Sequence, residues 1–404
     1  MIVCIHKDLL GSPRHLAQSS DRDSFSLCNS VPEDAWVIGS STPIERSLET
    51  IAKAAKFEID SDPPERYRKM WSSLLANEHK NPPWYLCLPP DVFKKYVEGL
   101  LDQLWMLLKS VDNTYYLEQF VIARRVILGL QRAKVDPAVL DRTISAEKHD
   151  QIKMSLEKFR PCSDGYARRT TYSQTSSLTG RLTVTDGPNI LTLKKDQRSI
   201  IQSRYKSGVI AQVDFVSLEP RVMLKIMSVE PPVDIYTSVV ENVFTGSISR
   251  DIAKTSTILT LYGGSPHTLA KNIPSSSNVD PYEIHKTIRD YFSISSLESK
   301  LKRDLKKDGF IRNHYGRRIN SGSSLVNHFI QSTSVDVSLM GFGNLINELE
   351  IKSVRASPLY IIHDAMLFDI HYDDIEKFKK IIKSGITVPG FSGKFPATFE
   401  LIND

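Results

Sequence analysis

The sequence predicts an α+β protein, because a long helical stretch precedes two well-separated strand segments. Apolar residues recur every three to four positions through most of residues 91–159, which is the spacing of helices that pack on a core. Residues 209–213 (VIAQV) are predicted to form a strand, and residues 359–371 two strands that meet at His363-Asp364. So short a connection predicts an antiparallel hairpin with a carboxylate at its tip.

Composition is that of a globular protein and permits a nucleic-acid partner. Of the 404 residues, 41% are hydrophobic and 25% are charged, which suffices for a sizeable core divided into roughly two or three domains. Lys and Arg total 52 against 47 Asp and Glu, so the chain is only mildly basic. The four cysteines form no C-x-x-C pair, which predicts reduced thiols and neither a zinc site nor a disulfide framework.

The N-terminal region carries no targeting signal that we recognise. Lys7 and Asp8 interrupt the start of the chain, and no later run approaches the roughly 18 apolar residues of a membrane span. We therefore expect no membrane partner and a cytoplasmic location. Residues 1–90 contain scattered Pro pairs, and only residues 44–56 and 65–75 have helical spacing, so the role of this region stays unknown.

Two segments carry positive charge that could face a partner. Residues 168–189 are rich in hydroxyl side chains, cannot form a core and include Arg181, so we interpret them as a loop that touches something. Residues 300–318 form the clearest basic patch, with eight cationic residues against two Asp: Lys300, Lys302, Arg303, Lys306, Lys307, Arg312, Arg317 and Arg318.

Asp214 and Asp364 are candidate metal ligands. Asp214 ends the strand 209–213, and Asp364 lies where the two C-terminal strands meet. Phosphoryl transfer by two metals about 3.5–4 Å apart uses carboxylates at such positions, and Asp oxygens suit Mg²⁺, as does a main-chain carbonyl such as that of Phe215. Each Asp taken alone is more typical of an ordinary turn or cap residue than of a metal ligand.

A periodic set of side chains marks residues 249–261 as a helix with a functional face. Arg250, Lys254, Ile258 and Tyr262 recur every four residues and therefore share one side of it. Two cations followed by an apolar and an aromatic residue would suit a nucleotide, with the phosphates at the cationic end. The alternative is a solvated basic end on a stripe that faces the core.

Four motifs resemble those of family A DNA polymerases, the bacterial polymerase I and phage replicase type. They occur in the family's order over residues 150–404: T-G-R-L (179–182), D-F-V-S-L-E-P-R (214–221), R-D-I-A-K-T-S-T-I-L-T-L-Y-G (250–263) and I-H-D (362–364). The resemblance implies a right-hand fold whose palm carries an antiparallel sheet and whose fingers and thumb are helical. It assigns 91–178 to the thumb, 179–233 and 310–404 to the palm and 234–309 to the fingers.

The resemblance also implies an activity, which is template-directed DNA synthesis with two Mg²⁺ ions, or Mn²⁺, on Asp214 and Asp364. Lys254 matches a residue that grips phosphate and protonates the leaving group, and Glu219 matches one that crowds the sugar 2′ position. The other matched positions are Arg250, Tyr236, Ile258 and Tyr262 at the nucleotide, and Arg181, Asn327, Gln331 and His363 at the primer-template. Arg317 and Arg318 of the basic patch are further candidates for DNA contacts.

Four positions depart from the family pattern. Ile258 stands where Phe or Tyr is usual, Tyr236 replaces a phosphate-binding His, Ser323 replaces a minor-groove Arg, and Ala365 replaces a Glu. The proposed metal and phosphate residues are retained, so activity is expected and the departures bear on nucleotide discrimination. The fingers are also short, since Lys254 follows Asp214 by only 40 positions.

Rival interpretations are a single-subunit RNA polymerase, which lacks T-G-R-L and a match to Glu219, and a noncatalytic nucleic-acid-binding relative. An H-D phosphohydrolase would need further His and Asp ligands around His363-Asp364. Residues 1–150 contain no Asp-x-Glu triplet, so we expect no proofreading exonuclease. The expected partners are primer-template DNA, deoxynucleoside triphosphates and replication accessory proteins. We expect a monomer, phage-like, in a bacterial or phage-infected cytoplasm.

Overall fold

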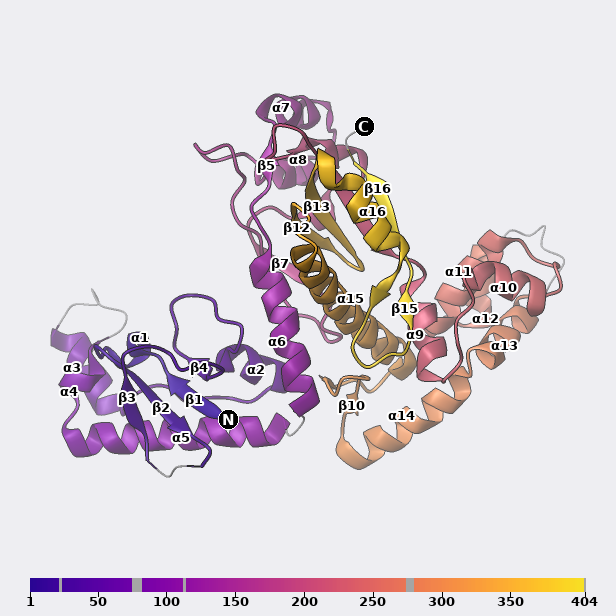
Figure 1. The fold of residues 1–404 in the computed structure, drawn as a ribbon. Coiled ribbons are helices and arrows are strands. Elements are labelled where there is room, and N and C mark those ends of the chain that lie inside the picture. The colour runs from indigo at the N-terminus through magenta and orange to yellow at the C-terminus, as the bar shows by residue number, and fades with distance from the viewer. Residues whose placement is uncertain (22–23, 75–81, 112–113, 274–279, 403–404) are drawn as a thin grey trace. The chain divides into compact units, whose positions relative to one another are not determined.

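The computed structural model describes residues 1–21, 24–74, 82–111, 114–273 and 280–402. Packing divides the chain into two compact units, Met1–Leu128 and Gly129–Asp404. Both units combine helices with strands, as expected for the α+β class (Figure 1).

The first unit contains a four-stranded sheet that the sequence did not predict. Its order is β3-β2-β1-β4, with β4 parallel to β1 and the other pairs antiparallel. The strands are β1 (Ile2–Ile5), β2 (His15–Ser19), β3 (Ser26–Cys28) and β4 (Trp36–Ile38). Each is only three to five residues long, too short to show a periodic pattern. Their strand form follows from mutual pairing instead.

Helices cover the sheet of the first unit. The predicted helices appear as α2 (Leu48–Ala55) and α3 (Glu65–Leu74), while the predicted last residue, Leu75, lies outside the described residues. They are joined by α1 (Lys7–Leu10), α4 (Trp84–Cys87), α5 (Pro90–Val111) and α6 (Thr114–Gly129). Figure 1 shows α5 lying along the sheet.

Helix α5 ties residues beyond position 90 to the first unit. Its buried stripe, which includes Leu100, Leu104 and Leu107, belongs to the same core as Val3 and Trp36. The boundary between packed units therefore lies at 128/129, whereas the sequence placed a boundary at 90/91. The assignment of 91–178 to a thumb stays a prediction.

The second unit is built on an antiparallel sheet of order β12-β13-β9-β16. Its strands are β9 (Gly208–Phe215), β12 (Ala356–Ile362), β13 (Ala365–His371) and β16 (Ala397–Leu401). In this register Asp214 on the central strand β9 lies opposite Ala365 on one side and Thr398 on the other. The strands expected at 209–213 and 359–371 are thus neighbours in one sheet.

Helices pack on both faces of this sheet (Figure 1). On one face, α15 (Leu325–Ile351) brings Phe342 to 5.2 Å from Phe215, and α16 (Ile375–Lys383) brings Phe378 to 5.3 Å from Phe368, between ring centroids. The other face is covered by α7 (Pro137–Ala146), α8 (Asp150–Glu157) and the 3₁₀ turns η1 (Ile190–Thr192) and η2 (Asp196–Ile200). Asp214 lies on this second face.

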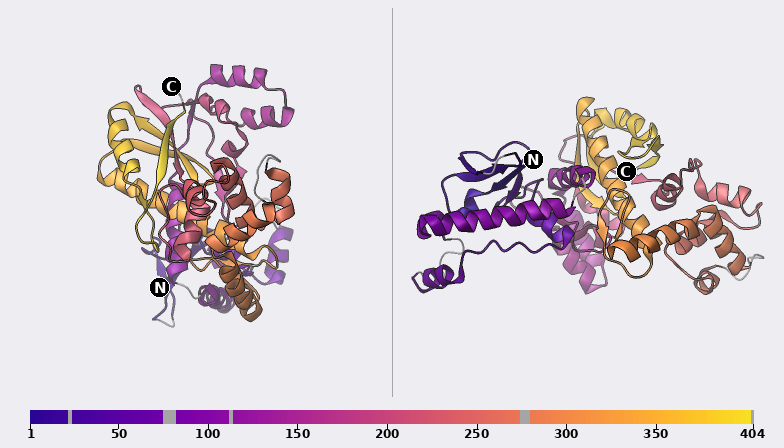
Figure 2. Two further views of the ribbon diagram at one scale, coloured as in Figure 1. Left: turned by 90° about the vertical axis from the view of Figure 1, so that its right-hand side faces the viewer. Right: turned by 90° about the horizontal axis from the view of Figure 1, so that it is seen from below.

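A group of helices occupies residues 218–308, between β9 and β13 in sequence. It comprises α9 (Leu218–Ile226), α10 (Ile235–Asn242), α11 (Arg250–Leu261), α12 (Pro266–Asn272), α13 (Pro281–Tyr291) and α14 (Ile294–Asp308). Helix α11 contacts α9, α10, α12, α13 and α15. Helix α14 leads from this group toward α15 (Figure 2) and contacts β10 (Ile311–Arg312), which pairs with β11 (Arg318–Ile319).

Short strand pairs complete the second unit. They are β5 (Lys134–Val135) with β8 (Ile201–Gln202), β6 (Thr171–Ser173) with β7 (Thr183–Asp186), and β14 (Ile386–Thr387) with β15 (Lys394–Phe395); η3 (Tyr372–Asp374) follows β13. Across the described parts of the chain, every helix is too short or too polar to cross a membrane.

Candidate active site

Asp214 and Asp364 line the same cavity of the second unit, which has a volume of about 480 Å³. Asp214 is near the end of β9, and Asp364 is in the two-residue turn between β12 and β13. His363, the other turn residue, has a φ of 57°, in the left-handed region that tight hairpin turns require. The main-chain N–H of Phe215 donates to the carbonyl of Asp364 over 3.3 Å, which joins the two strand ends.

The electrostatics of the two carboxylates fit a cation. Burial, and secondarily the charge of Asp364, raises the pKa of Asp214 to about 7. Burial likewise raises the pKa of Asp364 above its usual value. Two carboxylates that resist ionisation together are stabilised by a positive ion between them. Asp and main-chain carbonyl oxygens are hard donors suited to Mg²⁺, so the residues present fit the expected group.

The four periodic residues of α11 also line this cavity. Arg250, Lys254, Ile258 and Tyr262 all contribute to its wall, while the core-facing side of α11 is a different set: Ala253, Ser256, Thr257, Thr260 and Leu261. The alternative of a basic end on a core-facing stripe therefore does not describe this helix. Because several core-facing residues are Ser and Thr, packing rather than helix propensity stabilises α11.

Glu219 connects three elements at the inner side of the cavity. It is in the first turn of α9, its carboxylate lies 3.7 Å from the guanidinium of Arg181, and the hydroxyl of Tyr262 hydrogen-bonds to it. Burial raises the pKa of Glu219, while Tyr262 and Arg181 act in the opposite direction. The three predicted residues thus form one cluster, although they lie in separate segments of the sequence.

If Glu219 lies beside the sugar 2′ carbon of a bound nucleotide, as the resemblance implies, Glu219→Ala should open space there and increase ribonucleotide incorporation relative to deoxynucleotide incorporation. The measurement is the ratio of kcat/KM for the two nucleotides, which cancels general damage to the enzyme. Glu219→Gln is the matched control, since it retains the volume and should keep the deoxynucleotide preference. An unchanged ratio in Glu219→Ala would place the sugar elsewhere.

His363 lines the cavity beside Asp364. Burial, followed by the nearby positive charge of Arg181, lowers the pKa of His363 below its usual value. The lowered pKa favours the neutral imidazole, which can donate one hydrogen bond and accept another.

Helix α15 forms another wall through residues at helical spacing. Gln331, Ser334, Val335 and Ser338 line the cavity, whereas Asn327, one turn earlier, lies outside this set. The side-chain oxygen of Asn327 is buried without a hydrogen-bond partner among the described residues. Sequence reasoning named Gln331 and could have extended the face by counting i+3, i+4 and i+7. It could not have found Thr398, which reaches the cavity only because β16 pairs with β9.

The environment of Arg317 does not fit the predicted contact with DNA. Its side chain is 6% exposed and forms an ion pair with Asp336 of α15, with Nη2 at 2.7 Å from Oδ1 and Nε at 3.2 Å from Oδ2. Asn313 donates to the same carboxylate over 2.7 Å. Because the guanidinium is enclosed, Arg317 joins a loop to α15 instead of facing solvent.

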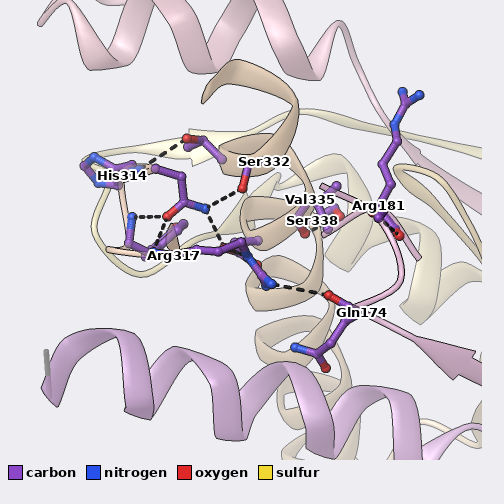
Figure 3. A network of polar contacts seen from close by, with 12 residues as sticks. Gln174, Arg181, His314, Arg317, Ser332, Val335 and Ser338 are labelled. Carbon is purple, nitrogen blue, oxygen red and sulfur yellow. Dashed lines mark hydrogen bonds and ion pairs between the residues drawn. The ribbon is translucent and has the colours of Figure 1, made fainter. Parts of the chain in front are cut away.

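The same arginine also supports the loop that carries Arg181. Gly180 adopts a φ of 77°, and a Cβ there would lie 2.8 Å from the guanidinium carbon of Arg317. Arg317 donates to the carbonyl of Gln174 over 3.4 Å, while the side chain of Arg181 points away from this network (Figure 3). The Gly of T-G-R-L is thus required for close packing, and Arg181 is left to the cavity.

The remaining candidates have distinct surroundings. Arg318 is half-buried, with its guanidinium 4.8 Å from the centre of the Phe310 ring. Ser323 is exposed just before α15, and Ala365 is buried opposite Asp214. Within the described residues there is no cluster of three or more His, Cys, Asp or Glu side chains arranged to bind a metal. A metal ion bound at this cavity would therefore rely on Asp214 and Asp364 with main-chain oxygen.

Known proteins share the sequence family of this chain. The model of DNA polymerase family A matches residues 142–390, more than half of the chain. DNA polymerase I of Bacillus subtilis (strain 168) is 22% identical over 282 residues, which cover 61% of this chain and 32% of that protein. DNA polymerase I of Aquifex aeolicus (strain VF5) is 22% identical over 242 residues, 54% of this chain and 42% of that protein. The chain thus spans less than half the length of these relatives.

The fold is shared with a solved structure as well. The POL domain of Pol1 from M. smegmatis, in complex with DNA primer-template and dNTP, superposes with a TM-score of 0.62 at 13% sequence identity. The match covers 96% of this chain and 92% of that chain, and it confirms the expected α+β polymerase fold. On the extent of the sequence match, the chain belongs to DNA polymerase family A.

Proposed function

We propose that this chain is a template-directed DNA polymerase that adds deoxynucleotides to a primer 3′-hydroxyl and does not proofread. The observation that carries the proposal is the single cavity lined by Asp214 and Asp364 at one side and by Arg250 and Lys254 at another. Carboxylates and cations in one cavity are the requirements of phosphoryl transfer from a nucleoside triphosphate.

The cationic residues of α11 bind and orient the triphosphate. Arg250 and Lys254 lie one helical turn apart on the cavity side of α11, so they can engage successive phosphate groups of one nucleotide. The primer 3′-hydroxyl gives its proton to solvent water, and its oxygen attacks the α-phosphorus while the bond to the pyrophosphate oxygen breaks. Lys254 supplies a proton to that leaving oxygen, which prevents charge from accumulating there.

Divalent metal ions are a general requirement of this family, and Mg²⁺, or Mn²⁺, is the ion we propose here. Asp214 and Asp364, with the carbonyl of Phe215, would hold two ions, which when bound lower the pKa of the primer hydroxyl and neutralise phosphate charge. The carboxylates themselves are fixed by strand pairing on β9 and by the β12–β13 turn. Such fixation limits the reorganisation needed during reaction.

The other cavity residues contact the sugar, the base and the primer-template. Ile258 and Tyr262 pack against the sugar and base, and Glu219 excludes a 2′-hydroxyl. Gln331 and Arg181 line the cavity. We propose that these two residues and Asn327 contact the minor groove of the primer-template. Acceptors there are similar for all correct pairs, so such contacts test the shape of a pair without reading its sequence. Arg318 remains a candidate for backbone contacts.

A primer-extension assay tests the proposal directly. The chain should extend a DNA primer on a DNA template with deoxynucleotides and Mg²⁺, and extension should stop without template. RNA synthesis without a primer would favour a single-subunit RNA polymerase, and DNA binding without extension would favour a noncatalytic relative. Removal of a mismatched 3′ end in the same assay would contradict the absence of proofreading. A co-purification from the host would identify accessory proteins.

Replacement of Ile258 with Tyr is expected to admit chain terminators. Ile258 lines the cavity between Lys254 and Tyr262, and an aliphatic side chain there cannot replace the hydrogen bond lost with a 3′-hydroxyl. A Tyr hydroxyl could, so kcat/KM for the dideoxynucleotide relative to the deoxynucleotide should rise several-fold, by order ~1 kcal/mol. Ile258→Phe is the matched control and should not change this ratio. Equal ratios in the two variants would contradict a sugar-facing position.

A further inference from the structure

Arg250 is held by two residues that lie outside the motif 250–263 and that we call the bracket. The bracket consists of Asp234 and Tyr236, which lie at the start of α10, next to the N-terminal end of α11. Asp234 Oδ2 accepts a hydrogen bond from Nε of Arg250 over 2.9 Å, and the guanidinium carbon lies 5.5 Å from the centre of the Tyr236 ring. One edge and one face of the guanidinium are therefore occupied by the protein.

The carboxylate of Asp234 is itself rigidly placed. As the N-cap of α10, its Oδ1 accepts from the main-chain N–H of Tyr236 and of Thr237 over 3.0 and 3.1 Å. The hydroxyl of Thr237 donates to Oδ2, the same oxygen that receives Arg250. Burial alone would raise the pKa of Asp234, but the hydrogen bonds from Arg250 and Thr237 outweigh it and hold the pKa at about 2. The group is thus fully ionised at physiological pH.

Tyr236 supplies a fixed, uncharged surface beneath the guanidinium. Its ring is 5% exposed and lines the cavity, and its hydroxyl hydrogen-bonds to Ser217 at the start of α9. A buried aromatic face attracts a cation without adding charge of its own. Arg250 therefore rests on a ring of α10 whose hydroxyl is tied to the N-cap of α9.

The bracket leaves the outer edge of Arg250 for a ligand. A guanidinium has five N–H donors in a planar fork, and the bond to Asp234 uses the one on Nε. The two terminal nitrogens remain, and they form a pair that can bind a phosphate in bidentate fashion. Because the side chain of Arg250 is 52% exposed, an unbracketed arginine would lose many rotamers when a phosphate ordered it.

We propose that Asp234 is a positioning residue that presents the terminal nitrogens of Arg250 to the outer phosphates of a nucleoside triphosphate, with Tyr236 as its supporting surface. The inference rests on the proposed function, since it assigns the phosphates of that reaction to Arg250. It also predicts selectivity for triphosphates, because the bracket would not increase the affinity for a nucleotide that lacks outer phosphates.

Substitution of Asp234 with Asn tests the proposal, because Asn keeps a good N-cap and removes the charge that Arg250 pairs with. KM for deoxynucleotides should rise about 10-fold, the loss of one charge-assisted contact, while kcat changes by less than about 3-fold. Asp280→Asn is the matched control: Asp280 caps α13 in the same manner, with no arginine partner among the described residues. It should leave KM unchanged. Tyr236→Phe, which keeps the ring, should raise KM less than Tyr236→Leu.

A double-mutant cycle decides between positioning and a merely structural role. In an Arg250→Ala background, Asp234→Asn should have no further effect on KM. Additive effects, or an unchanged KM in Asp234→Asn alone, would overturn the inference.

Equilibrium binding separates this inference from the proposed function. The titrants are a deoxynucleoside triphosphate and the matching monophosphate, with the full chain and Mg²⁺. If wild-type protein extends no primer, the proposed function fails. Asp234→Asn should still weaken binding of the triphosphate about 10-fold and leave the affinity for the monophosphate unchanged. Equal weakening of both nucleotides would overturn the inference.

Discussion

Asp214→Asn and Asp364→Asn are each expected to abolish primer extension while leaving primer-template binding largely intact. Each change removes one hard anionic ligand from the pair without altering its shape. Loss of several kcal/mol of charge stabilisation in the transition state corresponds to a rate reduction of about 10³-fold or more. Single-turnover extension measures this effect, and binding of a labelled primer-template by anisotropy measures the retained affinity. DNA affinity depends on contacts to phosphate and should fall with salt in all variants.

Repulsion between the two carboxylates predicts that both variants stay folded, so that stability can serve as a control for the loss of activity. The negative charge of Asp364 contributes to the raised pKa of Asp214, so neutralising either residue removes repulsion from the folded state. Thermal stability should therefore be unchanged or higher, and lost activity cannot be attributed to unfolding. Asp150→Asn, at a carboxylate with 93% exposure on α8, should keep full activity. Substantial extension by either active-site variant would refute the two-metal assignment.

Asp336→Asn is expected to lower the free energy of unfolding more than the other variants proposed here, because it leaves the guanidinium of Arg317 buried without a counter-ion. The two side chains are only 6% and 4% exposed, and Asn313 also depends on the same carboxylate. Removing one partner of a buried pair costs about 3–5 kcal/mol in the free energy of unfolding. Asp141→Asn is the matched control: its pair with Arg160 is exposed and should contribute less than about 1 kcal/mol.

The measurement should separate the two units of the chain. All four tryptophans, Trp36, Trp71, Trp84 and Trp105, lie in the first unit, so their fluorescence reports on that unit alone. Hydrogen exchange in α15 follows the second unit, where the effect is expected. The double variant Arg317→Met/Asp336→Leu should recover much of the loss, since an apolar pair leaves no charge unpaired. If Asp336→Asn unfolds at the wild-type denaturant concentration, the pair does not stabilise the fold.

The sequence predicted those elements whose form depends on local pattern. Helices α2, α5 and α11 and the strands beside Asp214 and Asp364 follow from spacing and turn chemistry. Helical spacing predicted that Arg250, Lys254 and Ile258 share the face of α11 that lines the cavity, whereas Glu219 on α9 and Gln331 on α15 were named through the family resemblance. Their chemical roles stay predictions.

The features that sequence could not reveal depend on contacts between distant segments. Strands β1–β4 are too short for periodicity, and Thr398 enters the cavity only through strand pairing. Arg317 was assigned to DNA because a run of cations usually faces solvent. Its partner Asp336 is 19 positions away, on a helix whose buried side also contains Ser332 and Thr333. The order of residues along the sequence does not indicate that these two side chains form an ion pair.

The order of strands in the second unit has a consequence for how the protein folds. Asp214 and Asp364 are on adjoining structural elements, yet the whole helical group α9–α14 and helix α15 separate them along the chain. The cavity cannot form until the two ends of this long segment come together. Strand pairing between distant segments is slow, because the chain loses conformational entropy before the new contacts can offset that loss. We therefore expect the acidic pair to come together late, after the helices have formed. The acidic pair is thus brought together in a fold that already contains the residues proposed to hold its substrate.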